Sequence, residues 1–346
     1  MKILIVTKNW LGDILFEFPT LEAIAQHYPH AEIACLAPER CREILENHPA
    51  VRRVILFDER GEHRSFWKKI RLVFELRREK WDQGYLFHRS RTRAFILWLA
   101  GVREIIGFEH KGRKVLLTRS VPEPEPGYHQ VDHFVQILKG IGVPAPESPR
   151  YRFYFKKEDR ASAELLMQRH GLRDFVCFHL GANWEPKRWP PAHFAKLADL
   201  ISAKTGWPVV VTGAERDQAL LDQMLKFTRS ASIVSLVAKT GLGSLGALFE
   251  KAKFMVSADS GPLHIASGVG TPVVAIFGPT HPEFTGPRGI GEVLLMQFIP
   301  EGFQSPWYGE NLPKEGWMSQ ISPEEVFRAI EAKNWLRAAF ETHVKT

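Results

Sequence analysis

Asp13 is the first of several residues whose type and position could do chemistry. It follows Gly12 shortly after an apolar run at residues 2–6. We expect a helix to begin at about Ile14, with the carboxylate at its entrance facing a cleft between two domains. An ionised carboxylate there can remove the proton of an attacking hydroxyl group. Asp is also among the best helix caps, so the spacing alone slightly favours a purely structural role.

The start of a second helix, within residues 256–264, is typical of an anion site. Ser260 can cap this helix, and Gly261 lets backbone N–H groups come close to a ligand. These groups and the positive end of the helix dipole favour phosphate oxygens, while Asp259 could accept hydrogen bonds from sugar hydroxyls. A plain strand-to-helix turn is the alternative, and His264 one turn later is more often a packed histidine than a ligand contact.

Two adjacent cations lie in a third segment, residues 179–190. Lys187 and Arg188 could neutralise a diphosphate leaving group without a metal. Adjacent Lys and Arg residues in a loop are usually just solvated. Trp189 and Pro190 favour the functional interpretation, because they would stiffen the loop and fix the direction of the cations.

Glu215 follows another predicted strand and could accept hydrogen bonds from ribose hydroxyls, although this signal is weak on its own. No Asp-x-Asp pair follows a strand, and no His/Cys cluster has the spacing of metal ligands, so a metal site has no support in the sequence. No Gly-x-Gly-x-x-Gly motif follows a strand, which argues against a nicotinamide or flavin dehydrogenase.

The positive charge of the chain is concentrated in one segment. Residues 60–119 contain 16 Lys or Arg against six Asp or Glu, whereas the rest of the chain contains 30 against 33. Such a segment could attract nucleic acid, an anionic membrane surface or a phosphorylated substrate, or it could be a solvated basic face. Nucleic acid is the weakest of these interpretations, because no helix-turn-helix, zinc-finger or aromatic RNA-binding motif accompanies the charge.

The elements that would position these residues alternate between strands and helices, the pattern of an α/β fold with parallel sheets. Short β-branched runs predict strands at residues 2–6, 32–36, 53–57, 83–87, 104–107, 175–178, 209–212, 233–236, 254–257 and 273–277. Apolar residues at helical spacing predict helices at 15–27, 39–47, 66–79 and 91–100. Open parallel sheets bind ligands at the carboxyl ends of their strands, where the candidate residues lie.

Three prolines within residues 143–149 predict a linker between two domains. We therefore expect a first doubly wound domain at residues 1–145, a second at 150–321, and a terminal helix within 322–346 that could pack back on the first domain. The chain is about twice a typical domain in length. No apolar run approaches the roughly 20 residues of a membrane span, and the first residues do not form a secretion signal, so we expect a cytoplasmic protein. Its three scattered cysteines favour reduced thiols.

Several motifs together resemble those of the ADP-heptose:lipopolysaccharide heptosyltransferase family. Their sequences are closer to heptosyltransferase II than to heptosyltransferase I. The resemblance covers nearly the whole chain. The matching motifs are Lys2-Ile3-Leu4-Ile5-Val6 with Gly12-Asp13, Pro19-x-Leu21, Gly181-Ala182 to Lys187-Arg188-Trp189-Pro190, Asp259-Ser260-Gly261-Pro262-Leu263-His264, Gly270-Thr271-Pro272 and Phe277-Gly278-Pro279-Thr280.

This resemblance implies a GT-B fold with two Rossmann-like domains and transfer of heptose from ADP-heptose, with inversion and without a metal or other cofactor. By matching position, Asp13 would be the general base, and the second domain would bind the donor. Lys187 would contact the diphosphate and Asp259 the heptose. The full set of implied donor residues is Asn183, Lys187, Arg188, Glu215, Thr240, Asp259, Ser260, Gly261 and His264.

The implied acceptor is the inner core of lipopolysaccharide, an anionic glycolipid made of lipid A with Kdo and heptose sugars. This gives the basic segment a purpose, and we expect it to receive phosphates and carboxylates of the acceptor at the cytoplasmic face of the inner membrane. The candidate acceptor residues are Arg64, Lys68, Arg89, Arg91 and Arg93. A relative that uses another sugar nucleotide or glycan, or a binding module without turnover, remains an alternative. The motifs favour second heptose addition but do not settle whether the acceptor is Kdo-lipid A or an already heptosylated core.

Overall fold

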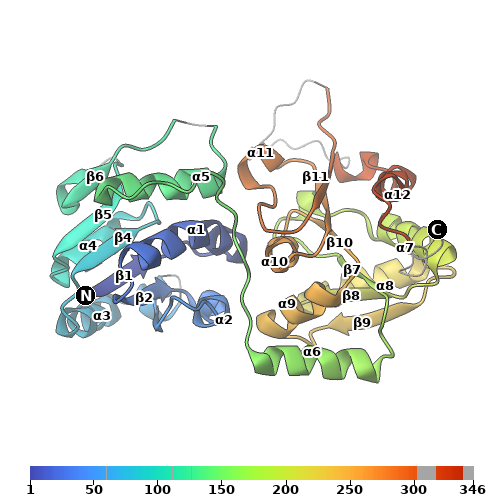
Figure 1. The fold of residues 1–346 in the computed structure, drawn as a ribbon, viewed down its shortest axis with the longest axis horizontal. Coiled ribbons are helices and arrows are strands. Elements are labelled where there is room, and N and C mark those ends of the chain that lie inside the picture. The colour runs from blue at the N-terminus through green and yellow to red at the C-terminus, as the bar shows by residue number, and fades with distance from the viewer. Residues whose placement is uncertain (60, 111, 126, 302–316, 338–346) are drawn as a thin grey trace, which may run out of the picture. The chain divides into compact units, whose positions relative to one another are not determined.

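The computed structural model describes residues 1–59, 61–110, 112–125, 127–301 and 317–337. The chain divides into two compact units, Met1–Tyr154 and Phe155–Thr346, each of which is described by itself (Figure 1). The boundary lies a few residues after the predicted linker. The reason is that Tyr151 packs against Phe16 and the Tyr154 hydroxyl donates a hydrogen bond of 2.8 Å to Glu22, so this stretch still belongs to unit 1.

Unit 1 is built on a parallel sheet of six strands in the order β3-β2-β1-β4-β5-β6. The strands are β1 (Lys2–Val6), β2 (Glu32–Ala37), β3 (Arg53–Leu56), β4 (Gln83–Leu86), β5 (Glu104–Phe108) and β6 (Arg119–Val121). The α-helices are α1 (Leu11–His27), α2 (Arg42–Glu46), α3 (Phe66–Arg78), α4 (Arg91–Leu99) and α5 (Gln130–Val135). Short 3₁₀ helices are η1 (Glu39–Cys41), η2 (Glu62–Arg64), η3 (Lys114–Leu116) and η4 (Gln136–Ile141).

Unit 2 repeats this topology with strand order β12-β11-β10-β7-β8-β9. Its strands are β7 (Val176–His179), β8 (Val209–Gly213), β9 (Ile233–Val237), β10 (Met255–Ala258), β11 (Val273–Phe277) and β12 (Val293–Gln297). Its α-helices are α6 (Lys157–Arg169), α7 (Pro191–Thr205), α8 (Gln218–Phe227), α9 (Leu242–Lys251), α10 (Gly261–Val269), α11 (Pro282–Thr285) and α12 (Pro323–Ala332). The 3₁₀ helices are η5 (Glu185–Lys187), η6 (Glu215–Asp217) and η7 (Trp317–Gln320).

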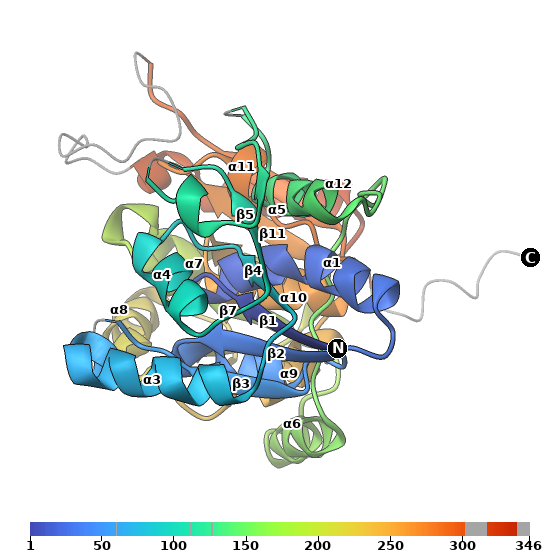
Figure 2. The same ribbon diagram turned by 90° about the vertical axis from the view of Figure 1, so that its left-hand side faces the viewer.

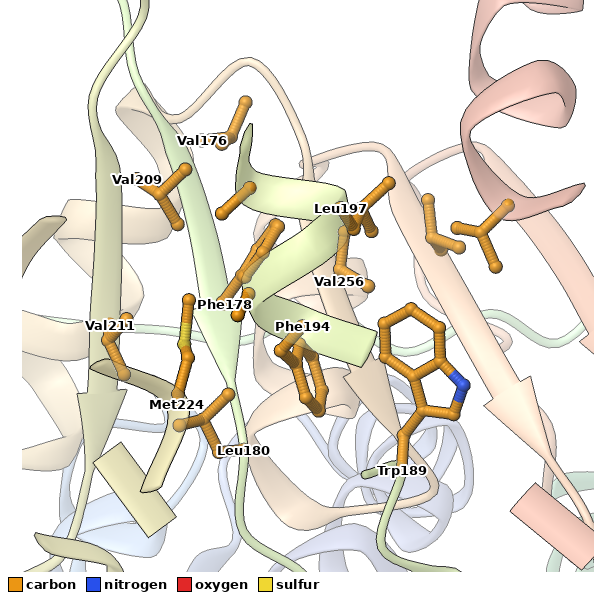
Figure 3. Packing of buried hydrophobic residues seen from close by; sticks show 14 of the residues in the cluster. Val176, Phe178, Leu180, Trp189, Phe194, Leu197, Val209, Val211, Met224 and Val256 are labelled. Atoms are coloured by element: carbon orange, nitrogen blue, oxygen red, sulfur yellow. The ribbon is translucent and has the colours of Figure 1, made fainter. Parts of the chain in front are cut away.

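Both cores follow from strands that are buried on two faces, as parallel sheets with helical crossovers require. All five residues of β11 are buried, and so are Ile3 to Val6 of β1. In unit 2, Phe178 of β7 lies against Phe194 of α7, and Trp189 closes the same core (Figure 3). The ten predicted strands are therefore present. The edge strands β6 and β12 were not predicted, because one is very short and the other is only partly buried.

The terminal helix α12 packs within unit 2. It contacts α7, and Val326 and Ile330 join the core of that unit. These two apolar side chains are thus part of the core of unit 2. Residues 338–346, the rest of the predicted terminal segment, lie outside the described residues.

The order in which successive strands are added to each sheet reverses at one point, the switch point. The first strand of each unit lies between the second and the fourth, so that helices on its two sides run to opposite faces. In doubly wound sheets ligands bind at the carboxyl ends of the strands that flank this switch point. These strand ends are those of β1 and β4 in unit 1 and those of β7 and β10 in unit 2.

Candidate active site

An ion pair lies at the switch point of unit 2. Lys187, in η5 after β7, places its Nζ 2.6 Å from Oδ2 of Asp259, the residue that follows β10. The two strands are direct neighbours in the sheet. A lysine and an aspartate that stand 72 residues apart in the sequence are therefore brought together at the place where the fold binds ligands.

Three groups surround the buried Asp259 carboxylate. Besides Lys187, the Thr280 hydroxyl donates a hydrogen bond of 2.8 Å to Oδ2, and His264 Nε2 lies 3.7 Å from Oδ1, an ion-pair distance. Burial raises the pKa of Asp259, but His264 and Lys187 outweigh burial and hold the pKa at about 2. The carboxylate is thus ionised at neutral pH and can accept hydrogen bonds from hydroxyl groups.

The start of α10 adjoins this ion pair. Ser260 is the N-cap, and its Oγ accepts a hydrogen bond of 3.4 Å from the Leu263 N–H, as the sequence predicted. Its Oγ also lies 2.9 Å from Oγ of Ser257, which fixes the cap on β10. Gly261 is the first helical residue, so the N–H groups at this end have no partner within the helix and are suited to an anion.

The loop that carries Lys187 is anchored at its far end. Trp189 is buried in the core of unit 2, where its ring meets that of Phe194 edge-on (Figure 3). Its Nε1 donates a hydrogen bond of 2.9 Å to the Ile321 carbonyl. Arg188 Nε donates to the Ala182 carbonyl at 3.1 Å. These contacts tie the loop to the core of unit 2 on the carboxyl side of Lys187. Arg188 uses part of its guanidinium to hold the loop.

The remaining donor candidates lie at neighbouring strand ends. Asn183 follows β7 and accepts a hydrogen bond of 2.8 Å from Arg216. Glu215 is exposed at the start of η6, after β8, and Thr240 is partly buried after β9. They share one edge of the sheet with Lys187, because β7, β8 and β9 are adjacent and parallel.

In unit 1 the structure corrects the predicted position of Asp13. Helix α1 begins at Leu11, its N-cap is Trp10, and that cap makes no side-chain hydrogen bond. The Ile14 N–H already bonds to the Trp10 carbonyl at 3.0 Å. Asp13 therefore lies within the first turn and is not the N-cap, although its charge still complements the helix dipole.

One turn further along α1, Glu17 is fully buried. Its Oε1 accepts a hydrogen bond of 2.7 Å from the Lys8 N–H, while Oε2 has no hydrogen-bond partner. Burial raises the pKa of Glu17 well above its usual value, and the charge of Asp13 acts in the same direction. Sequence inspection missed this residue, although its position between Ile14 and Leu21 at helical spacing marks the buried face of α1.

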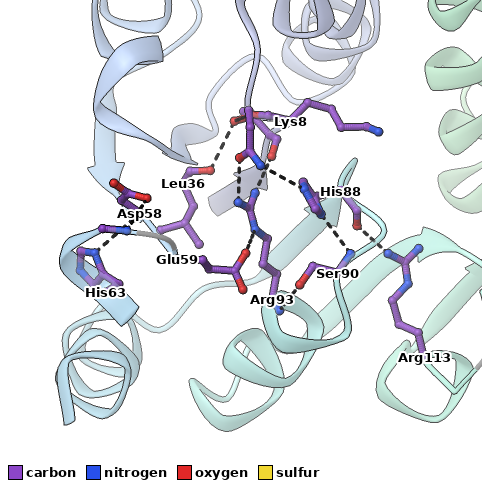
Figure 4. Close-up of polar contacts among 12 residues, drawn as sticks. Lys8, Leu36, Asp58, Glu59, His63, His88, Ser90, Arg93 and Arg113 are labelled. Atoms are coloured by element: carbon purple, nitrogen blue, oxygen red, sulfur yellow. Dashed lines mark hydrogen bonds and ion pairs between the residues drawn. The ribbon is translucent and has the colours of Figure 1, made fainter. Parts of the chain in front are cut away.

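Arg93 lies inside unit 1, at its switch point, and not on the surface. Its Nε bonds to Glu59 at 3.0 Å, Nη1 to the Thr7 carbonyl at 2.8 Å, and Nη2 to Asn9 Oδ1 at 2.8 Å (Figure 4). The guanidinium also lies over the Phe57 ring. The predicted position of Arg93 in a basic surface patch is thus corrected: this side chain is buried and is hydrogen-bonded to the loop that leads into α1.

His88 extends this network from the end of β4. Its Nδ1 accepts a hydrogen bond of 3.0 Å from the Ser90 N–H, and its Nε2 lies 3.3 Å from Asn9 Nδ2 (Figure 4). Arg113 donates to the His88 carbonyl at 2.6 Å. Burial, with the charge of Arg93, lowers the pKa of His88 to about 3. The ring is therefore neutral. Because a neutral imidazole accepts a hydrogen bond at one nitrogen only, the ring can accept from either the Ser90 N–H or Asn9 Nδ2, but not from both at once.

Comparison with known proteins identifies the family. Residues 69–296 match glycosyltransferase family 9 (heptosyltransferase). The chain belongs to this family. It is 29% identical over 304 residues to lipooligosaccharide heptosyltransferase 2 of Haemophilus influenzae, which covers 83% of this chain and 86% of that protein.

Solved structures share the fold of this chain. A glycosyl transferase family 9 protein from Veillonella parvula superposes with a TM-score of 0.86 at 24% identity, over 97% of both chains. ADP-heptose LPS heptosyltransferase II of Escherichia coli superposes with a TM-score of 0.79 at 25% identity, over 97% of this chain and 98% of that one. The predicted GT-B fold and the resemblance to heptosyltransferase II are both confirmed.

The four other candidate acceptor residues, chosen from the basic segment, lie on the surface of unit 1. Arg64 and Arg91 are exposed, Lys68 lies 3.5 Å from Glu62, and Arg89 pairs with Glu123. They keep side chains within reach of solvent, unlike Arg93.

In the described part of the chain, neither a group of metal-binding side chains nor a membrane-spanning helix is found. Within it, no group of three or more His, Cys, Asp or Glu side chains is arranged to hold a metal ion. In the same ranges, no helix is both long and apolar enough to cross a bilayer.

Proposed function

We propose that this protein transfers heptose from ADP-heptose to the inner core of lipopolysaccharide, with inversion at the anomeric carbon. Family 9 membership supports the heptosyl transfer. Relatives named lipopolysaccharide or lipooligosaccharide heptosyltransferase 2 support the acceptor, and the E. coli structure named for ADP-heptose supports the donor.

The observation that carries this proposal is the ion pair of Lys187 and Asp259 beside the start of α10. A diphosphate would bind the N–H groups at Ser260 and Gly261 and draw Lys187 toward its oxygens. Asp259 would then be available to the heptose hydroxyls, with Thr280 and His264 still holding it. The site thus supplies an anion site and a hydroxyl acceptor side by side.

Residues at the neighbouring strand ends complete the proposed donor site. Glu215 would accept from the ribose hydroxyls, Thr240 would line the adenine pocket, and Asn183 would lie near the diphosphate. Arg216 is a further candidate for donor binding. It donates a hydrogen bond to Asn183, follows Glu215 in the sequence, and lies at the same edge of the sheet. Arg188 would orient the loop through Ala182.

The proposed reaction is a single displacement. The acceptor hydroxyl attacks the anomeric carbon from the face opposite ADP, and Asp13 takes its proton as the new carbon–oxygen bond forms. The bond from the anomeric carbon to the β-phosphate oxygen breaks, and the electron pair leaves with ADP. Lys187 and the start of α10 stabilise the charge that develops there, so the step needs no metal or other cofactor.

The proposed acceptor is anionic and lies at the cytoplasmic face of the inner membrane. Arg64, Lys68, Arg89 and Arg91 would meet its phosphates and carboxylates, since they are exposed on unit 1. Ion pairing at exposed sites is screened by salt, so acceptor binding should weaken as the ionic strength rises. Binding that is insensitive to salt would contradict this part of the proposal.

The test is turnover with purified substrates, read by product mass. ADP-heptose should be consumed with Kdo-lipid A or with a heptosylated core, and one heptose should be added to one of them. UDP-sugars in parallel reactions should give no product. Transfer from a UDP-sugar, or no transfer from ADP-heptose to either acceptor, would refute the proposal.

A further inference from the structure

Helix α3 presents aromatic side chains to solvent. Trp67 and Phe74 are 75% and 60% exposed, and they share one face with Arg71 and Arg78, because positions 67, 71, 74 and 78 follow the helical repeat. The opposite face of α3 is already satisfied, since Leu72 and Leu76 are buried in the core of unit 1. The aromatic face is therefore not needed to hold α3 in place.

Helix α4 adds to this surface. It packs against α3, and both helices lie on the side of unit 1 that faces the viewer in Figure 2. Phe95 and Trp98 are half-exposed on α4, and their rings stack at a centroid distance of 5.7 Å and an angle of 16°. Two neighbouring helices thus present apolar rings outward in place of polar side chains.

The same helices carry the positive charge. Helix α3 contains five Lys or Arg against a single Glu, and this Glu75 accepts from Arg71 at 2.9 Å. We call the whole set the aromatic–basic surface. It consists of Phe66, Trp67, Lys68, Arg71, Phe74, Arg77 and Arg78 of α3 and of Phe95 and Trp98 of α4.

We propose that the aromatic–basic surface docks on an anionic lipid bilayer. Indole and phenyl rings beside lysine and arginine are the side chains that an interface of headgroups and acyl chains favours, since the rings enter the boundary and the cations remain at the phosphates. A second copy of this chain carries the same positive charge on this surface, so charge disfavours it as the occupant. The inference rests on the proposed function in that the acceptor is a glycolipid held in such a bilayer.

The first experiment is co-sedimentation of the full chain with vesicles. Vesicles of phosphatidylethanolamine with phosphatidylglycerol should bind the protein, and vesicles of phosphatidylcholine alone should bind it weakly. The double variant Trp67→Ser/Phe74→Ser should lose at least about tenfold in affinity for the anionic vesicles. The matched control is Leu165→Ser/Phe227→Ser, which removes side chains that are 64% and 56% exposed in unit 2 and should bind as the wild type does.

A charge variant tests the other half of the surface. Arg71→Ala/Arg78→Ala should weaken binding to the anionic vesicles by about 25-fold, taking a factor of about five for each cation. Equal binding of this variant and the wild type would overturn the electrostatic part. Equal binding of Trp67→Ser/Phe74→Ser and the wild type would overturn the proposal. The proposal would also be overturned if the wild type bound no vesicles but formed a dimer that the Trp67→Ser/Phe74→Ser variant dissociates.

Turnover separates this inference from the proposed function. With a water-soluble, deacylated acceptor, Trp67→Ser/Phe74→Ser should transfer heptose at the wild-type rate, because no bilayer is involved. Loss of vesicle binding with normal transfer is the expected result for this variant. If the wild type transfers heptose but binds no vesicles, only the docking surface is refuted. If it binds vesicles but transfers no heptose, only the proposed function is refuted.

Discussion

The switch points of the two units share a topology but use their cations differently. In unit 1, Arg93 is buried and gives its N–H groups to Glu59, Thr7 and Asn9. In unit 2, Lys187 is partly exposed and pairs with the single carboxylate of Asp259. A planar guanidinium with five donors can brace several chain segments, whereas an ammonium group is a mobile point charge. Arg93 thus braces several segments of unit 1, whereas Lys187 has a single partner in its ion pair with Asp259, which is the basis for the donor-binding role proposed for it.

The buried carboxyl groups differ in the same way. Asp259 is compensated by Lys187, Thr280 and His264, and its pKa is held at about 2. Glu17 has one backbone donor, and burial raises its pKa well above the usual value. Folding therefore favours the charged form of Asp259 and disfavours the charged form of Glu17.

The largest expected effect on stability is that of Arg93→Met. This change leaves Glu59 without its partner and leaves the Thr7 carbonyl and Asn9 with one bond fewer inside the protein. We expect the free energy of unfolding to fall by about 3–5 kcal/mol, as for other buried ion pairs that lose one member. Urea unfolding of the variant measures it.

The control for this prediction is Arg91→Met, on the same helix but exposed. It should change the free energy of unfolding by less than about 0.5 kcal/mol. If Arg93→Met were as mild as this control, Arg93 would not be a structural brace and the contrast between the two units would be lost.

A smaller effect on stability is expected for Lys187→Ala in unit 2. The variant should lose about 1–3 kcal/mol of unfolding free energy, because Asp259 keeps Thr280 and His264. ADP affinity should fall about 10- to 100-fold, since a charge-assisted contact to the diphosphate is lost. Isothermal titration with ADP measures this, with the exposed Lys196→Ala as control.

The pH dependence of the Lys187→Ala deficit follows from the depressed pKa of Asp259. A carboxyl group whose pKa is lowered on folding stabilises the protein above its unfolded pKa of 3.8, and this contribution is lost as the pH falls toward 2. The deficit of the variant should therefore be full at neutral pH and shrink between about pH 4 and pH 2. A deficit that grows on acidification would contradict the assigned pairing.

The smallest expected effect is that of Glu17→Gln, and its sign is opposite. Because burial raises the pKa of Glu17, ionisation of this group opposes folding at neutral pH. Glutamine keeps an acceptor for the Lys8 N–H and carries no charge, so the variant should melt at a higher temperature than the wild type at pH 8. The gain should shrink as the pH falls toward 4.5, the usual pKa of the group. A lower melting temperature at pH 8 would show that the Glu17 charge is needed.

The sequence predicted the strands well because buried parallel strands are short β-branched runs. The predicted bounds of β1 and β11 coincide with those observed. The start of α1 was predicted too late, because Trp10 is not a residue type that marks a cap. The edge strands β6 and β12 lack a full apolar run, so no pattern separated them from loops.

The candidate site was only partly visible in the sequence. Motif residues Lys187 and Asp259 do meet, but their neighbour Thr280 was missed as a contact because it belongs to a separate strand end. Arg93 was taken for a surface cation on charge alone. Its spacing to Ile96 and Leu97, which are buried, shows the face on which it lies, so helical periodicity carried the signal that net charge hid.

The most direct test of the central claim, that unit 1 supplies the base and unit 2 holds the donor, is the kinetics of Asp13→Asn. The account predicts that kcat for heptose transfer falls by about 10²- to 10⁴-fold, while the affinity for ADP-heptose stays close to that of the wild type. A variant with the kcat of the wild type would contradict the assignment of Asp13 as the base. A loss of donor affinity as large as that of Lys187→Ala would contradict the division of roles between the units.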